Sequence, residues 1–154
     1  DRFNNIPIYN NQGENGRNKS NGGYNYGLKW QCVEFVKRYY YDYLNHKMTN
    51  TYGHAKDFYN FGLKDGSFNK GRGLTQYSNK STTKPKVNDI VIMSGHIFNK
   101  YGHIAIISKV SENEIEIAQQ NVGRKTRVIL ILNKINGLWT IENDRILGRL
   151  RINK

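Results

Sequence analysis

Apolar residues with helical spacing first appear at Cys32. From there they recur three, four and seven positions apart, which is the pattern of an amphipathic helix with one buried side. We therefore predict a helix from Cys32 to about Leu44, with its apolar side facing a core. A second, shorter helix is predicted over "GHAKDFYNFG", residues 53–62.

From residue 88 onward the pattern changes to that of β-strands. Short apolar or alternating runs follow one another, separated by turn-forming residues such as Ser111 and Glu112. Strands are predicted at residues 88–94, 102–110, 113–121, 126–132, 138–143 and 146–152. The Gly-, Ser- and Lys-rich residues between 62 and 86, punctuated by Pro85, are predicted to be a connection.

This order of elements predicts an α+β domain. Helices come first and adjacent antiparallel strands second, so we expect N-terminal helices packed on one sheet of about five to six strands. At 154 residues the chain is long enough for one domain with a single core. Residues 1–25 are rich in Asn and Gly and are expected to form an N-terminal arm, and residues 26–154 the domain itself.

The composition is that of a soluble globular protein with a strong positive charge. Apolar residues make up 37% of the chain, and no run approaches the roughly 18 apolar residues of a membrane span. Lys and Arg total 24 against 12 acidic residues, a net charge of +12. Such a charge favours association with polyanions, such as nucleic acid, anionic lipid or an anionic wall polymer. The chain starts at Asp1 without Met, so we expect that a leader has been removed.

Cys32 is the only cysteine, and it stands where a glycine-containing loop runs into the predicted helix. A single cysteine forms no internal disulfide and no Cys-rich zinc site. In the first turn of a helix, unpaired N–H groups and the helix dipole lower the pKa of a thiol and so favour the nucleophilic thiolate. A lone cysteine is also often a packing residue. Position alone leaves both roles open.

A cysteine hydrolase needs a base, normally histidine, and a third group that orients the imidazole. His46 and His54 fall in polar segments and are expected at the surface, whereas His96 and His103 flank a loop. His103 opens the most strand-like run of the chain and follows Gly102, which permits a close approach of the backbone. A base and a hydrogen-bonded histidine at a sheet edge both fit this pattern.

The strand after His103 brings two amides into consideration. If the turn at Ser111 and Glu112 closes a hairpin, the end of the next strand returns to the imidazole, where Gln119 or Asn121 can accept from its N–H. The four histidines lack a helical metal-binding spacing and have no cysteine partners. No metal site and no cofactor are therefore expected.

Three blocks of the sequence resemble CHAP domains, which are cysteine, histidine-dependent amidohydrolases/peptidases of the papain-like NlpC/P60 group. The blocks are "WQCVEFVKR" at residues 30–38, "GHIAII" at residues 102–107 and "NEIEIAQQN" at residues 113–121, in the order and spacing of the family. The likeness is strongest to the amidase domain of bifunctional glutathionylspermidine synthetase/amidases, and it covers nearly the whole chain. It implies a papain-like fold and hydrolysis of an amide through an acyl-enzyme.

The resemblance assigns Cys32 as the nucleophile and His103 as the base. It places Gln31 in an oxyanion hole shared with the backbone N–H of Cys32, because such donors stabilise the charge of the tetrahedral transition state. The third position is usually Glu or Asp in the family and is Gln119 here. We expect activity with a weakened third group, or with Asn121 in its place.

The first block also contains candidate substrate-binding residues. Trp30 is expected to wall the cleft or to pack beneath the helix. Lys37 stands where related amidases place a basic residue, and is a candidate for binding a substrate carboxylate. Glu34 and Arg38 are four positions apart and are expected to form a surface ion pair.

Two substrates fit the resemblance. Most CHAP domains cleave peptidoglycan peptides, and the net charge of +12 suits a wall with acidic polymers. The most similar amidases cleave a small glutathione–polyamine conjugate, although a polycationic tail gains nothing from a basic enzyme. The first substrate is favoured and implies a secreted, periplasmic or wall-associated monomer, while the second implies a cytoplasmic enzyme.

A third possibility is a weakly active or inactive binder of anionic wall polymer. The mixture of arginine and tyrosine in "RYYYDYL", residues 38–44, is also found in platforms that bind single-stranded nucleic acid. Three adjacent tyrosines point in different directions on a helix, so most of them should pack in the core. Nucleic acid is therefore not expected as a partner.

Overall fold

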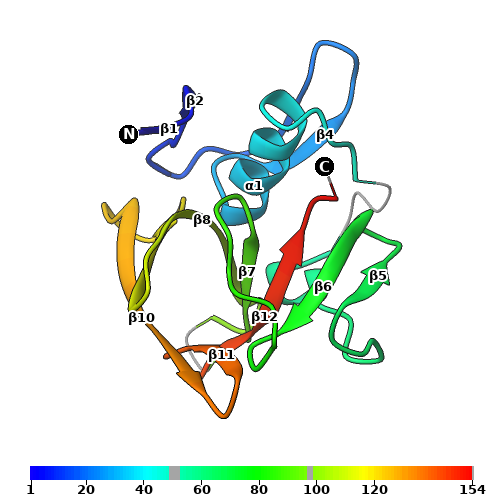
Figure 1. The fold of residues 1–154 in the computed structure, drawn as a ribbon. Helices are drawn as coiled ribbons and strands as arrows, with labels where there is room; N and C mark the ends of the chain where they lie inside the picture. Colours follow the sequence, from blue (N-terminus) through cyan, green and yellow to red (C-terminus); the bar gives the residue numbers. More distant parts are fainter. Residues whose placement is uncertain (49–52, 97–98, 154) are drawn as a thin grey trace.

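One antiparallel sheet of eight strands forms most of the fold in the computed structural model, which describes residues 1–48, 53–96 and 99–153 (Figure 1). The strand order is β11-β10-β9-β8-β7-β12-β6-β5. The strands are β5 (Ser67–Asn69), β6 (Leu74–Ser78), β7 (Ile90–Met93), β8 (His103–Val110), β9 (Glu114–Ala118), β10 (Arg127–Ile135), β11 (Leu138–Ile141) and β12 (Ile146–Arg151). The strands β7 and β8 are therefore neighbours near the middle of the sheet.

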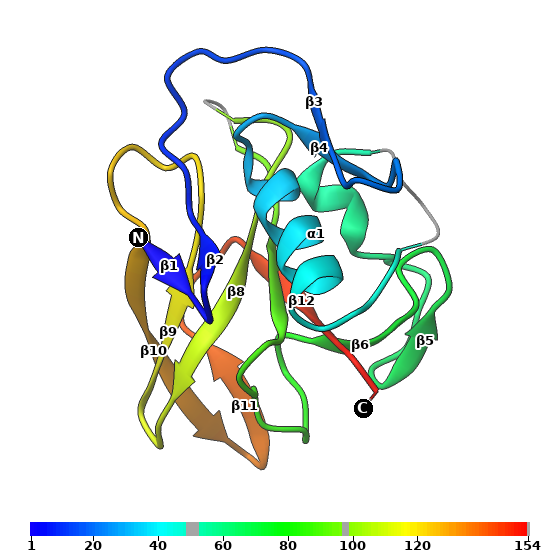
Figure 2. The ribbon, with the colours of Figure 1, turned by 90° about the horizontal axis from the view of Figure 1, so that it is seen from above.

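The N-terminal part of the chain adds two small strand pairs beside this sheet (Figure 2). β1 (Arg2–Phe3) pairs with β2 (Ile6–Pro7), and β3 (Arg17–Lys19) pairs with β4 (Asn25–Leu28). The helices that follow β4 are the α-helix α1 (Cys32–Asp42) and the short 3-10 helix η1 (Ala55–Phe58). Within the described ranges, no helix has the length and apolar character needed to cross a membrane.

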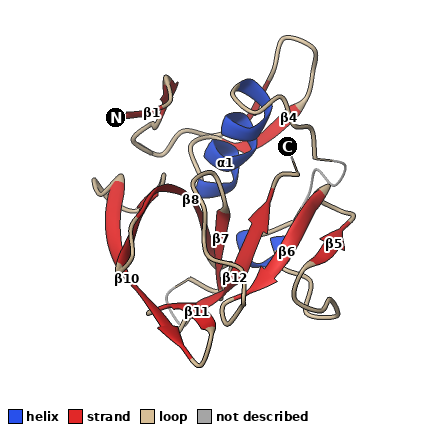
Figure 3. Cartoon of the chain, viewed as in Figure 1, coloured by secondary structure: helices blue, strands red, loops and turns tan. Residues whose placement is uncertain are grey.

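The central strands are buried on both faces, which explains their unbroken apolar sequence. Ile90 and Ile92 of β7 belong to a core cluster that contains the apolar side of α1, namely Phe35, Val36, Tyr39 and Tyr40. Val91 and Met93 point to the opposite face, where they pack with apolar residues of β10 and β11. Helix α1 thus covers one face, and the sheet's own outer strands curl over the other (Figure 3).

The predicted first helix and the six predicted C-terminal strands are confirmed. The helix ends at Asp42, slightly before its expected end. The strands β7 to β12 start within the predicted ranges, and β10 continues to Ile135, three residues farther than expected. Apolar patterning was sufficient for these elements because each has a face in one of the two cores.

The predicted fold class is wrong. We expected a papain-like α+β fold with N-terminal helices packed on a sheet of five to six strands. The described residues form a mostly β structure with a single α-helix and an eight-stranded sheet. The face of the sheet opposite α1 is covered by apolar residues of β10 and β11, and not by a second helix.

The predicted second helix is reduced to one turn. Within residues 53–62, only the four residues of η1 are helical. The carboxylate of Asp57 accepts the backbone N–H of His54 at 2.9 Å, which closes this turn, and the chain is extended again at Tyr59. A turn bounded in this way does not propagate into an α-helix.

The predicted connection between residues 62 and 86 instead contains the strands β5 and β6. In β6 the buried positions are Leu74 and Gln76, so the inward face carries a polar residue. The Gln76 amide donates to the backbone carbonyl of Asn60 at 2.8 Å, which satisfies it in the core. Because half of the inward face is polar, the strand lacks the apolar alternation that would have predicted it.

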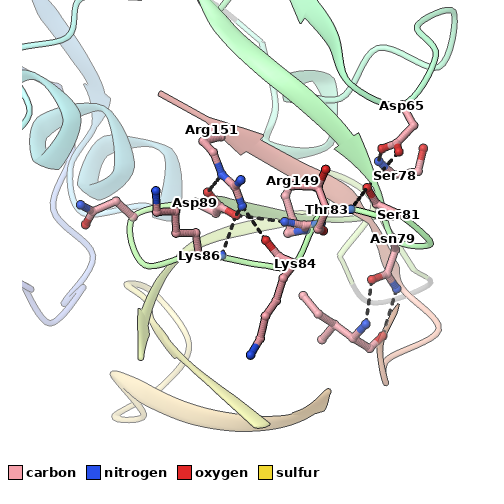
Figure 4. A network of polar contacts seen from close by, with 12 residues as sticks. Asp65, Ser78, Asn79, Ser81, Thr83, Lys84, Lys86, Asp89, Arg149 and Arg151 are labelled. Carbon is pink, nitrogen blue, oxygen red and sulfur yellow. Dashed lines mark hydrogen bonds and ion pairs between the residues drawn. The ribbon is translucent and has the colours of Figure 1, made fainter. Parts of the chain in front are cut away.

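A buried charge cluster fastens β12 to the start of β7 (Figure 4). Asp89 accepts from Arg149 Nη1 at 3.1 Å and from Arg151 Nε at 2.8 Å. The two guanidinium groups also donate to the backbone carbonyls of Thr83 and Lys84. Asp89 and Arg149 are each only 1% exposed, so one buried carboxylate pairs with a buried arginine and with the partly exposed Arg151.

Candidate active site

Cys32 is the first residue of α1 and lines a groove with a volume of about 700 Å³. Gln31 occupies the helix N-cap position with extended backbone, and its exposed side chain lines the same groove. The walls include Arg17 and Asn121, which come from distant parts of the chain. The Cys32 side chain is half-buried. A ligand in the groove therefore contacts Cys32.

The surroundings of Cys32 act on the pKa of its thiol in opposite directions. Burial raises the pKa of the thiol, whereas the backbone N–H groups of Ile104, Val33 and Cys32 itself lower it. The contact with Ile104 shows that the thiol lies at the start of β8, directly after His103. The start of α1 and the start of β8 therefore lie next to each other.

Gly102 allows His103 to reach this position. Gly102 has φ +78°, and a Cβ atom there would lie 2.4 Å from the carbonyl oxygen of Met93 on β7. A larger residue would be both strained and too close to the neighbouring strand. The close approach expected from the sequence is therefore present, and His103 heads β8 opposite Met93.

A chain of hydrogen bonds fixes the imidazole of His103. Gln119 Nε2 donates to the backbone carbonyl of Lys125 at 3.0 Å, so Gln119 Oε1 is the end that faces the histidine. His103 Nε2 lies 3.0 Å from this oxygen and must donate to it. The other nitrogen, Nδ1, then carries a lone pair. This is the tautomer that a general base requires.

The pKa of His103 is lowered from its ordinary value. Burial is the main cause, and the positive charge of Arg145 adds to it, whereas the hydrogen bond to Gln119 acts in the opposite direction. Arg145 is held nearby by two bonds to the carbonyl of Ser94, at 3.0 and 3.3 Å. The imidazole is therefore neutral over most of the physiological pH range.

Comparison with known proteins matches residues 22–121 to the CHAP domain family. This chain belongs to that family. The bifunctional glutathionylspermidine synthetase/amidase of Escherichia coli (strain K12) is 33% identical over 99 residues, which is 62% of this chain and 16% of that protein. Glutathionylspermidine synthase of Crithidia fasciculata is 33% identical over 102 residues, or 63% of this chain and 14% of the relative. Trypanothione synthetase of the same organism is 25% identical over 123 residues, which is 77% of this chain and 19% of that protein.

The resemblance seen in the sequence is thereby confirmed, for CHAP domains and for the glutathionylspermidine synthetase/amidase. Family membership and these relatives together support a CHAP-type amidohydrolase in general terms. The chain spans at most 19% of the length of the relatives named above.

In this CHAP domain, Gln119 and Asn121, the two candidates for orienting the imidazole, occupy different places. Gln119 bonds directly to His103, as described above. Asn121 lines the groove near Cys32, has φ +70°, and its side-chain oxygen accepts from Asn11 Nδ2 at 3.1 Å. The structure thus brings Gln119 to the imidazole and Asn121 to the groove wall.

The ion pair between Glu34 and Arg38 is not at the surface, as was expected, but buried. Arg38 donates to both carboxylate oxygens of Glu34, at 2.7 and 3.2 Å. Gln120 joins them, because its Nε2 donates to Glu34 at 2.9 Å and to the backbone carbonyl of Gln31 at 2.8 Å. This network ties the residue before Cys32 to the end of β9. The first block of the motif therefore contains residues that hold the backbone beside Cys32 in place.

Trp30 and Lys37 do not line the groove within the part of the chain that the structure describes. Trp30 packs against Tyr9 of the N-terminal arm, with ring centroids 4.1 Å apart. Lys37 is fully buried; its ammonium donates to the carbonyl of Asn25 and lies 4.9 Å from the ring centre of Tyr24. Both residues hold α1 against the N-terminal segment in this arrangement.

The groove also contains polar and aromatic residues that were not predicted from the sequence, among them Arg17, His54 and Tyr101. His54, expected simply at the surface, lines the groove and packs against Tyr101 with ring centroids 4.3 Å apart and the rings tilted by 32°. Arg17 reaches the groove from β3. The position of Tyr101 two residues before His103 was a usable signal. Nothing in spacing or composition marks His54 or Arg17, because only the fold brings them to Cys32.

Proposed function

We propose that this CHAP domain is a cysteine amidohydrolase that cleaves an amide bond of peptidoglycan peptides through an acyl-enzyme. The observation that carries the proposal is that the thiol of Cys32, a residue of the groove wall, lies against the backbone of Ile104 at the start of β8, the strand whose first residue, His103, is held as the neutral tautomer. Family membership gives independent support.

In the proposed mechanism, His103 Nδ1 takes the thiol proton as Cys32 attacks the carbonyl carbon of the amide. The oxyanion receives hydrogen bonds from the backbone N–H of Cys32 and from the side-chain amide of Gln31. The imidazolium then gives its proton to the departing amine, which leaves a thioester on Cys32. A water molecule, deprotonated by His103, hydrolyses the thioester and restores the thiol.

The net charge of +12 supports a wall substrate, because walls that carry acidic polymers attract a basic protein. This substrate implies an exported or wall-associated protein. A second candidate is a small glutathione–polyamine conjugate, favoured by the likeness to the synthetase/amidase of Escherichia coli. A third candidate is a binder of anionic wall polymer without turnover.

Incubation with purified sacculi and with a glutathione–polyamine conjugate separates these functions, with wild type compared to Cys32→Ala. We expect soluble peptides to be released from sacculi by the wild type alone. Cleavage of the conjugate alone, lost in the variant, would assign the second function. Retention of both forms on sacculi without release would assign the third.

The role of Gln119 gives a test within the site. Removing it in Gln119→Ala should lower turnover by about 10- to 100-fold, since orienting partners of this kind typically contribute that much. Asn121→Gly removes the other amide while keeping a backbone of φ +70° unstrained, and should have the smaller effect. Steady-state turnover of both variants shows which of the two amides orients the imidazole. Collapse of Asn121→Gly with an active Gln119→Ala would move the orienting role to Asn121.

The lowered pKa of His103 predicts the acid side of the pH profile. The imidazole must be neutral to accept a proton, so kcat/KM should fall only as pH drops through a pKa below about 6.5. Because the charge of Arg145 contributes to the lowering, Arg145→Gln should move this acid limb to higher pH.

Arg145→Lys keeps the charge and is the matched control, with an acid limb expected near that of the wild type. The measurement is kcat/KM against pH for the three proteins. A wild-type acid limb above the ordinary histidine pKa, or a downward shift in Arg145→Gln, would contradict the assignment of His103.

A further inference from the structure

Gln120 is the buried centre of the hydrogen-bond network at the start of α1. Its side chain is 1% exposed and uses every hydrogen-bonding position of its amide. Nε2 donates to the Gln31 carbonyl at 2.8 Å and to Glu34 Oε1 at 2.9 Å. Oε1 accepts from the Tyr9 N–H at 2.8 Å and from Arg38 Nη2 at 3.3 Å. Two of these partners only accept and two only donate, so the orientation of the amide is fixed.

The bond from Gln120 to Gln31 acts on the peptide group that contains the N–H of Cys32. The carbonyl of Gln31 and the N–H of Cys32 belong to one planar unit, so the direction of the carbonyl determines the direction of the N–H. The same carbonyl also accepts the N–H of Phe35, at the longer distance of 3.3 Å. Gln120 therefore makes the shorter of these two bonds that hold the plane of the peptide group.

The N–H of Cys32 lies where the proposed reaction takes place. As the first N–H of α1, it has no acceptor within the helix. Burial raises the pKa of the Cys32 thiol, and this N–H is among the groups that lower it, so it lies close to the sulfur. A carbonyl carbon that bonds to the sulfur brings its oxygen close to the same N–H. The hydrogen bond to the Gln31 carbonyl also polarises the peptide group and so makes its N–H a stronger donor.

We propose that Gln120 is a positioning residue for the reaction, which directs the N–H of Cys32 at the oxyanion and strengthens it as a donor. The proposal rests on the proposed function, because it requires Cys32 to attack a carbonyl carbon. Gln120 directly follows Gln119, which holds the imidazole of His103. Two consecutive amides therefore serve two parts of the site, and the backbone between them fixes these parts relative to each other.

Two reagents that react with the same thiol test the proposal without the natural substrate. The Cys32 thiolate adds to the carbonyl carbon of p-nitrophenyl acetate, negative charge develops on the carbonyl oxygen, and p-nitrophenolate departs to leave an acetyl thioester. With iodoacetamide the thiolate displaces iodide and forms an S–C bond, and no oxyanion develops. Release of p-nitrophenolate, corrected for that of Cys32→Ala, measures the first reaction. Loss of the free thiol measures the second, because Cys32 is the only cysteine.

The quantity of interest is the ratio of the two rate constants, for p-nitrophenyl acetate over iodoacetamide, which cancels the fraction of thiolate. We expect this ratio to be about tenfold higher in the folded wild type than in the chain unfolded in urea. Gln120→Met should lose most of the gain, because Met has a similar length but donates no hydrogen bond. Gln120→Glu should lose it as well, since its carboxylate still accepts from Tyr9 and Arg38 but cannot donate to Gln31.

Asn18→Ala is the matched control within the same network. It removes the bond from Asn18 Nδ2 to Glu34 Oε2 at 3.1 Å and leaves the bond between Gln120 and the Gln31 carbonyl in place. The ratio of this variant should equal that of the wild type. Circular dichroism shows that each variant is folded before its ratio is compared.

A wild-type ratio in folded Gln120→Met or Gln120→Glu would overturn the proposal and leave the proposed function standing. An equal loss in Asn18→Ala would also overturn it, because the effect would then belong to the network as a whole and not to the Gln31 carbonyl. Failure of the proposed function appears in the wild type instead, as a ratio that is the same in the folded and unfolded chain or as a thiol that reacts with neither reagent. Either result would reject the oxyanion hole and the role of Gln120 together.

Discussion

Replacing Cys32 by alanine is expected to lower amide hydrolysis by a factor of about 10⁴ or more, since loss of the nucleophile leaves only binding and oxyanion stabilisation. Cys32 lines the groove with its thiol beside the start of β8, and the chain has no other cysteine to replace it. The measurement is the single-turnover rate on the substrate that the wild type cleaves.

Cys32→Ser is the matched variant, because it nearly preserves the shape of the site while substituting a much less acidic hydroxyl. It should also lose most activity, and both variants should still bind substrate and unfold at a temperature close to that of the wild type. If Cys32→Ala retained more than about a tenth of the wild-type rate, the nucleophile would have to be a different group.

Asp89→Ala is expected to cost about 3–5 kcal/mol of unfolding free energy, the usual result of removing one partner from a buried ion pair. Arg149 would be left 99% covered with its charge unbalanced, and Arg151 would lose its carboxylate partner (Figure 4). Because the cluster holds β12 against the start of β7, the strand that pairs with His103 would lose its support. Urea unfolding followed by circular dichroism measures the effect.

Asp144→Ala provides the control, since Asp144 is exposed and the change in net charge is the same; we expect a change within about 0.5 kcal/mol. Asp89→Asn keeps the shape and some hydrogen bonding, and should fall between the two. An Asp89→Ala protein as stable as Asp144→Ala would show that the cluster contributes little to the fold.

The elements that the sequence predicts well are those whose side chains face a core on at least one side. The apolar pattern after Cys32 gives α1, and the runs around Ile90–Met93 and His103–Val110 give the central strands. The predicted fold class was wrong because tertiary contacts decided the structure of two segments. Gln76 forms its amide hydrogen bond inside the core, so β6 lacks the alternating apolar pattern that would have predicted a strand. The hydrogen bond between the Asp57 carboxylate and the His54 N–H closes a single turn, so the predicted second helix does not extend.

In the candidate site, too, some residues could be predicted from the sequence and others could not. The order of Cys32, His103 and Gln119 along the chain was enough to propose a set of residues, and the hairpin between β8 and β9 brings the last two together. Charged residues were harder to place. Glu34 and Arg38 have the spacing of a surface pair, and only their contacts with the buried Gln120 show that they support Gln31, the residue before Cys32.

Arg17 was out of reach of the sequence for a different reason. It lies in an Asn- and Gly-rich segment with no periodicity, and its place in the groove depends on the pairing of β3 with β4. Strand pairing of this kind is set by backbone hydrogen bonds and turn geometry, which leave little trace in residue type.

The most direct measurement of the central claim is intact-mass spectrometry of the wild-type protein quenched in acid during turnover. Our account predicts a mass increase equal to the acyl half of the substrate, mapped by peptide digestion to Cys32, and absent when His103 is replaced by alanine. An adduct on any other residue, or steady product formation with only unmodified protein at every quench time, would contradict it.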